Sequence, residues 1–164
     1  MSEQEGQDHT EVMNSVGGGW QKANGLRIVR AVSGEVIGEL EIGPQHHQSY
    51  GIVHGGVHCA VIETLASMGA AIDAAAQGKA VVGLENHTSF IRAVRSGTLR
   101  GVARPVTRGR RSHVWEASIH DDQGRLVATG RVRLLVLEPE ADLAGQRVEV
   151  KGAGEGPDGP PGAG

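Results

Sequence analysis

The order of its segments predicts that this 164-residue chain has an α+β fold, with one long helix packed on an antiparallel sheet. Two strand-like segments come first, one long helical segment follows, and four strand-like segments come after the helix. Only four residues are aromatic, so the core must be built largely from Val, Leu, Ile and Ala. An antiparallel sheet buries one face, and a single central helix is the natural cover for that face.

The first two strands are expected at residues 26–32 and 35–42, because both segments are rich in aliphatic residues. Ser33 and Gly34 separate them as a turn pair would, which predicts a hairpin. A Gly-Pro pair ends the second strand. Residues 45–53 are then expected to form a loop that leads to two adjacent glycines.

A long helix is expected from Val57 to about Ala76, since apolar residues recur there at helical spacing. The residues at this spacing are Val57, Ala60, Val61, Thr64, Leu65, Met68, Ala71, Ile72 and Ala75. Gly78 then follows, as is typical of a helix end. The standard rise per residue gives this helix a length of about 30 Å.

Four further strands are expected after the helix, separated by turn signals rich in Gly, Asp, Arg and Ser. Their expected ranges are 80–92, 97–107, 112–120 and 125–137. The third alternates clearly, with Trp115, Ala117 and Ile119 on one face, and the fourth alternates in the same way. Alternation of this kind predicts a sheet with one buried face.

Composition divides the chain into three parts, residues 1–19, 20–137 and 138–164. The first part has four acidic residues and no Lys or Arg, and the last has six acidic residues against two basic ones. The middle part has fourteen basic residues against nine acidic ones. We expect both end segments to be disordered, because they bury too little apolar surface to offset the entropy of ordering. The folded domain is therefore expected at 20–137.

Composition also predicts a cytoplasmic protein that neither spans a membrane nor binds nucleic acid. There is no long uninterrupted apolar run, and the first residues lack the basic and apolar regions of a signal peptide. Cys59 is the only cysteine, so no disulfide can form within the chain. Seven arginines fall between Arg92 and Arg111, either on a solvated strand face or in an anion site. Nucleic acid is the less favoured partner because stacking aromatic residues are nearly absent there.

The pattern that indicates chemistry is His54-Gly55-Gly56, followed by an apolar helical segment that carries Glu63. Two adjacent glycines leave backbone N–H groups free of side chains. At a helix start these groups have no intrahelical partner, and they lie at the positive end of the helix dipole. Such a site stabilises an oxygen that gains negative charge, and a carboxylate could act as base or nucleophile on a carbonyl held there. The pattern therefore predicts acyl-transfer chemistry.

Glu63 is expected on a flank of the helix, roughly 120° from the centre of the apolar stripe, with Ser67 one turn further along. The neighbouring residues on this flank are Cys59, Ala66 and Ala70, which are all small. A solvated helix face usually carries several Lys and Glu residues. We therefore expect this flank to be buried against a second copy of the chain, which would place Glu63 at a subunit interface.

These residues, with Gln48 and Gly51 before them, resemble the motif of the hotdog-fold acyl-CoA thioesterases of the aryl-CoA branch. Two groups of that branch are similar, the 4-hydroxybenzoyl-CoA thioesterases and the 1,4-dihydroxy-2-naphthoyl-CoA thioesterases of menaquinone biosynthesis. The segments that look like the naphthoyl group are 81–85, 100–102, 113–115 and 122–126, and the segment that looks more like the benzoyl group is 86–90. The resemblance covers residues 26–137.

The resemblance implies a helix wrapped by a curved antiparallel sheet, dimers with a continuous sheet that pair into tetramers, and active sites between subunits. Glu63 would attack the thioester or activate water, and the Gly55 N–H would polarise the thioester carbonyl. The supporting catalytic residues would be Gln48, His54 and Ser67. The substrate and its CoA part would be bound by Gly56, Ser89, Phe90, Arg92, Arg108, Arg110 and Arg111. The chemistry needs no metal or cofactor, and CoA enters as part of the substrate.

Three other interpretations stay open at this point. A hotdog hydratase or dehydratase would act on similar thioesters, although its usual His-based motif is missing here. A non-catalytic acyl-CoA-binding protein could use the same fold. A metal site is suggested by His46, His47, His54 and His58, but no Asp or Cys joins them at a typical spacing. His46 and His47 are expected to be exposed loop residues.

Overall fold

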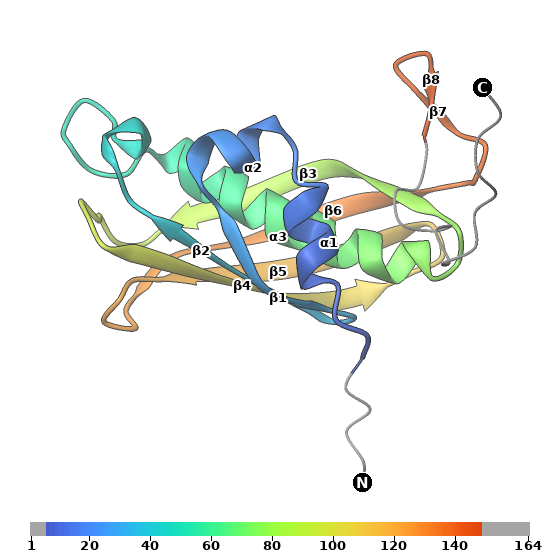
Figure 1. Ribbon diagram of the computed structural model, residues 1–164, viewed down its shortest axis with the longest axis horizontal. Coiled ribbons are helices and arrows are strands. Elements are labelled where there is room, and N and C mark those ends of the chain that lie inside the picture. The colour runs from blue at the N-terminus through green and yellow to red at the C-terminus, as the bar shows by residue number, and fades with distance from the viewer. Residues whose placement is uncertain (1–5, 149–164) are drawn as a thin grey trace, which may run out of the picture.

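A computed structural model describes residues 6–148 of the chain. Six antiparallel strands form one sheet, and the long helix α3 lies across one face of it (Figure 1). The strands are β1 (Arg27–Val32), β2 (Glu35–Glu41), β3 (Ala80–Phe90), β4 (Thr98–Arg108), β5 (Ser112–His120) and β6 (Leu126–Leu137), and α3 is Gly55–Ala75. The predicted α+β class is confirmed, and each predicted strand and the helix lie within two residues of their expected bounds.

The order of the strands in the sheet is β1-β2-β4-β5-β6-β3. The first two strands form the predicted hairpin, in which Val32 pairs with Glu35. Strand β3 follows the helix in the chain, but it lies beside β6 and not beside β4. Strand β3 is thus the last strand of the sheet, so one of its edges is unpaired within residues 6–148.

The core lies between α3 and the inner face of the sheet. Trp115 on β5 is fully buried there, as its alternation predicted. The ring lies directly against Gly69 of α3, where an added Cβ would lie 2.4 Å from two ring carbons. Glycine at 69 therefore allows the backbone of the helix to approach the largest side chain of the core.

Helix α1 (Thr10–Ser15) lies along β1, in a segment that the composition predicted to be disordered (Figure 1). The Asn14 side chain donates to the Ile28 carbonyl and accepts from the Ile28 N–H, each at 2.9 Å. The Thr10 hydroxyl accepts from the Ala31 N–H at 2.9 Å. The prediction was wrong for this helix, because its polar side chains occupy backbone groups of β1 that would otherwise bind water.

Two further elements, one at each end of the described chain, lie partly or wholly outside the predicted domain bounds of 20–137. Helix α2 (Gly19–Asn24) begins at the last residue of the segment 1–19 that was predicted to be disordered. After β6, two short strands, β7 (Asp142–Leu143) and β8 (Gln146–Arg147), form a small exposed hairpin in the segment predicted to be disordered. The remainder of the disorder prediction falls on 1–5 and 149–164, which lie outside the described residues.

Helix α3 is long and apolar enough to cross a membrane if only length and composition are considered. In this fold it is the core helix, since it packs on all six strands of the sheet. Nine of its residues are buried, including Val61, Ile62 and Leu65. Its apolar character is therefore explained by the core that it fills.

Candidate active site

The first turn of α3 presents a free backbone N–H group. His54 precedes the helix in an extended conformation (φ −65°, ψ 135°), and its Nδ1 accepts a hydrogen bond from the Gly56 N–H at 2.8 Å. The Gly55 N–H is at the first helical position and has no intrahelical acceptor. It also lies at the positive end of the helix dipole. The local geometry is thus suited to an oxygen that becomes negatively charged.

An aromatic ring lies beside this amide. A Cβ added at Gly55 would lie 2.7 Å from two carbons of the Phe90 ring, which comes from the end of β3. The Phe90 and His58 rings are 6.0 Å apart between centroids. His58 itself is buried on α3, and this burial lowers its pKa, which favours the neutral ring. Because Phe90 is 58% exposed, its ring presents an aromatic surface next to the Gly55 N–H.

Glu63 is half-buried on α3, where it faces β3 of its own chain. Ser67 Oγ donates to Glu63 Oε1 at 3.0 Å, so the structure brings together two residues that the sequence placed on one flank. Asn86 Nδ2 donates to Glu63 Oε2 at 3.0 Å. Space for the carboxylate comes from Gly83, where a Cβ would lie 2.5 Å from Oε1. Each oxygen of this carboxylate therefore has one side-chain donor.

The flank that carries Glu63 is covered differently from what we expected. Ala66 and Ala70 are fully buried inside the chain itself, so the prediction that a second copy covers them is wrong. Both residues belong to the hydrophobic core of the chain. Small residues on a helix flank can thus reflect close packing within one chain as well as a subunit interface.

Glu63 and Gly55 are too far apart to act on one atom within a single chain. Eight residues of helix separate them, which corresponds to about 12 Å along the helix axis. A carbonyl carbon under attack lies about 3 Å from the attacking atom, and its oxygen accepts a hydrogen bond of about the same length. The distance along α3 exceeds what one thioester group can bridge.

Gln48 lies in the loop before α3, where its side chain is turned to the loop itself. Its Oε1 accepts from the Tyr50 N–H at 2.6 Å, and its backbone carbonyl accepts from the Gly51 N–H at 2.9 Å. These bonds fix a tight turn in which Gly51 has a positive φ of 70°. The side-chain nitrogen of Gln48, Nε2, is the group that remains available to contact a substrate.

The predicted CoA-binding residues fall at two ends of the molecule. Ser89 and Arg92 are exposed at the end of β3 and just after it, on the side of Phe90. Arg108, by contrast, forms an ion pair with Asp73 in the last turns of α3, with Nε and Oδ2 3.0 Å apart. Two further predicted residues, Arg110 and Arg111, are exposed in the adjoining turn between β4 and β5. Within one chain, the structure therefore does not bring Arg108 close to Arg92.

Three of the four histidines considered as metal ligands, His46, His47 and His54, have hydrogen-bond partners within the chain. His46 is fully buried, so the prediction that it is exposed is wrong. Its Nδ1 accepts from the Gly43 N–H, and its Nε2 lies 2.9 Å from the Asn24 carbonyl. His47 Nε2 lies 2.7 Å from the carbonyl of Arg95. Among residues 6–148 no three His, Cys, Asp or Glu side chains gather as metal ligands would.

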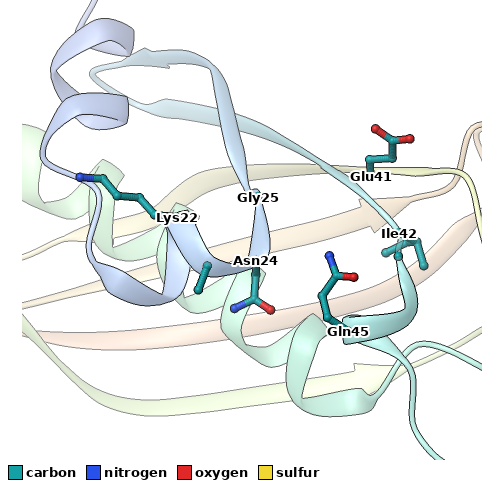
Figure 2. Close-up of a pocket in the computed structure, with 8 residues that line it drawn as sticks. Lys22, Asn24, Gly25, Glu41, Ile42 and Gln45 are labelled. Atoms are coloured by element: carbon teal, nitrogen blue, oxygen red, sulfur yellow. The ribbon is translucent and has the colours of Figure 1, made fainter.

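An open pocket of about 390 Å³ lies elsewhere, between α2 and the end of β2 (Figure 2). Its lining is Lys22, Ala23, Asn24, Gly25, Glu41, Ile42, Gly43 and Gln45. Neither Glu63 nor Gly55 contributes to it, and the side chains of Lys22 and Glu41 lie on opposite sides of it (Figure 2). Its largely polar lining makes it unsuited to an acyl group.

Comparison with known proteins identifies the family. Residues 50–128 match the thioesterase superfamily, a segment that contains both Gly55 and Glu63. The proofreading thioesterase EntH of Klebsiella pneumoniae is 36% identical over 113 residues, which are 69% of this chain and 82% of EntH. The chain belongs to the thioesterase superfamily.

Two further relatives agree with this assignment. Rv1847 of Mycobacterium tuberculosis is 46% identical over 102 residues, which are 61% of this chain and 73% of that protein. Its structure has a TM-score of 0.71 at 41% identity and covers 73% of this chain and 96% of that one. The structure of a mutant of thioesterase PA1618 from Pseudomonas aeruginosa has a TM-score of 0.74 at 26% identity. The match covers 78% of this chain and 93% of that one. The predicted hotdog fold and a thioester hydrolase are thus confirmed at the level of the superfamily.

Proposed function

We propose that this protein hydrolyses an aromatic acyl-CoA thioester to a free acid and CoA, with Glu63 as the catalytic carboxylate. The observation that carries the proposal is the pair of hydrogen bonds from Ser67 and Asn86. These bonds hold the Glu63 carboxylate in one orientation between α3 and β3. A carboxylate that acts as base or nucleophile in acyl transfer is more effective when its orientation is fixed before the substrate binds.

The reaction has two routes from the same geometry. In one, Glu63 takes a proton from water, which attacks the thioester carbon; in the other, Glu63 attacks that carbon itself and water then cleaves the mixed anhydride. In both, the carbonyl oxygen gains negative charge, the C–S bond breaks and the sulfur leaves as a thiolate that takes up a proton. A backbone N–H aimed at that oxygen contributes on the order of 10²–10³ in rate, which is the role proposed for Gly55.

The distance along α3 supports a site shared by two subunits. Because Glu63 and Gly55 of one chain are about 12 Å apart along the helix, the amide that faces a given Glu63 belongs to a second copy. Strand β3 offers the surface for that copy, since it is an edge strand that exposes apolar residues. These are Leu84 and Phe90, together with Ile91 just after the strand, and each is at least half exposed. We propose a dimer through β3, with a tetramer built from two dimers.

An aromatic acyl group is supported by Phe90. Its exposed ring lies against Gly55, where the acyl carbonyl would be bound, and an aryl ring next to the carbonyl can stack on it. Arg92, which follows on the same strand end, is proposed to bind CoA phosphates. A reaction in menaquinone biosynthesis fits this acyl class. No metal or cofactor is required, and a lone cysteine agrees with a cytoplasmic location.

A substrate panel with active-site variants tests the proposal. The panel holds benzoyl-, 4-hydroxybenzoyl-, phenylacetyl-, 1,4-dihydroxy-2-naphthoyl- and linear acyl-CoAs, with an enoyl-CoA hydration assay as the control for other hotdog chemistry. We expect hydrolysis of an aryl-CoA, and a loss of about 10²–10⁴-fold in kcat for Glu63→Gln. Hydration without hydrolysis, or full hydrolysis by Glu63→Gln, would contradict it. A solution mass equal to one chain would refute the shared site.

A further inference from the structure

Strand β3 contains a bulge beside Glu63. Gly83 pairs with Leu134 of β6, whereas Glu85 pairs with Arg133, so the pairing advances two residues on β3 for one on β6. Leu84 is the extra residue. Since side chains alternate between the two faces of a strand, one extra residue moves every later side chain to the opposite face.

The bulge decides which side chains of β3 face α3. Strict alternation from Gly83 would place Glu85 on the helix face, with a second carboxylate next to the first. After the bulge it is instead Asn86 that pairs with Val132, and Val132 is fully buried under the helix. Directly paired residues share a face. The extra residue therefore substitutes an amide for a carboxylate opposite Glu63.

Hydrogen bonds fix the orientation of that amide. Asn86 Nδ2 donates to Glu63 Oε2 at 3.0 Å and to the Cys59 carbonyl at 3.1 Å. Both of these partners only accept hydrogen bonds here, so the NH₂ group must be the one that faces them. On its other side, Oδ1 accepts from the Thr88 hydroxyl at 2.6 Å. One amide thus ties the carboxylate to the helix backbone and to β3.

We propose that Asn86 is a positioning residue for the Glu63 carboxylate, with Thr88 fixing the orientation of the Asn86 amide. The inference rests on the function proposed above, and it assigns a role to two residues on the strand opposite the helix. Ser67 and Asn86 hold one carboxylate oxygen each. Ser67 is on the same helix as Glu63, so Asn86 is the contact that relates the carboxylate to the sheet edge.

Four variants test this role on the aryl-CoA that the panel shows to be hydrolysed fastest. Asn86→Ala is expected to lower kcat by on the order of ten- to a hundredfold with KM unchanged, because a displaced carboxylate loses its attack geometry. Asn86→Asp is expected to lower kcat further, since it removes the donor and adds a like charge. Thr88→Val is expected to lower kcat, and Thr88→Ser, which keeps the hydroxyl, is expected to restore it.

Folding is checked separately by thermal unfolding and by solution mass. We expect both to stay close to wild type, because Asn86 is exposed and Thr88 is only half-buried. The proposal is overturned if Asn86→Ala has the wild-type kcat, or if it raises KM alone, which would make Asn86 a substrate contact. It is also overturned if Thr88→Val and Thr88→Ser have the same kcat.

The Glu63→Gln background separates this inference from the proposed function. If Asn86 acts through Glu63, adding Asn86→Ala to Glu63→Gln leaves the residual rate unchanged, because the two residues act as one unit. Additive losses would refute that. If Glu63→Gln alone keeps full activity, the proposed function fails, whatever Asn86 does. If Glu63→Gln is inactive while Asn86→Ala is fully active, only the positioning role fails.

Discussion

The ion pair between Arg108 and Asp73 leads to a prediction about stability that also tests a predicted CoA contact. The Asp73 side chain is only 7% exposed, and it accepts from Ser33 Oγ at 2.8 Å while facing Arg108 Nε at 3.0 Å. Removing one partner of a fully buried pair costs about 3–5 kcal/mol. Because the Arg108 side chain is 42% exposed and water screens the pair, we expect Arg108→Ala to cost about 2 kcal/mol.

The assay is thermal unfolding together with steady-state kinetics. For a chain of this size, about 2 kcal/mol lowers Tm by roughly 4–8 °C. Arg108→Ala/Asp73→Asn should recover part of this loss, because it leaves no unpaired buried charge. Arg92→Ala is the matched control: we expect an unchanged Tm and a KM that rises more for aryl-CoA than for the corresponding N-acetylcysteamine thioester. An unchanged Tm for Arg108→Ala, with KM raised for the CoA ester alone, would refute the structural role of Arg108.

Two other predictions concern the core. Gly69→Ala should destabilise the fold by about 1–3 kcal/mol, since its Cβ would lie 2.4 Å from the Trp115 ring; chemical denaturation measures this, and an unchanged midpoint would contradict it. Burial lowers the pKa of His58, so the unfolded chain binds a proton that the folded chain does not. Stability should therefore fall as the pH drops below about 6.5. His58→Gln should make this loss of stability at low pH smaller. Burial also lowers the pKa of His113, which accounts for the remaining loss. An identical pH dependence of Tm in the wild type and in His58→Gln would exclude His58 as a cause.

Most of the fold could be predicted from the sequence, because the signals for it are local. The helix was found from the spacing of its apolar residues, and β5 from the alternation of Trp115, Ala117 and Ile119. The proximity of Glu63 and Ser67 also followed from a local rule, since residues four apart on a helix are neighbours. By contrast, the place of β3 beside β6 depends on long-range pairing that no local pattern contains.

The errors have specific physical causes. The composition of residues 1–19 is typical of disorder. Composition alone, however, does not show that single side chains such as Asn14 and Thr10 form hydrogen bonds with backbone groups of a strand. His46 was taken as exposed because loops are usually at the surface, yet its ring is held by hydrogen bonds inside the molecule. Asn86 was missed because alternation along β3 gives the wrong face unless the bulge is known. The available signal was Gly83, since a glycine inside a predicted strand often marks a bulge.

The position of α1 along β1 has a consequence for how copies of this protein can assemble. A sheet with two open edges can add strands at both, which leads to chains of unlimited length. Here the hydrogen bonds of Asn14 and Thr10 close one edge, so that growth is possible only at the other. Two copies that joined at their remaining edges would leave no open sheet edge for a third, so the six-residue helix α1 limits edge-to-edge strand addition to a pair of copies.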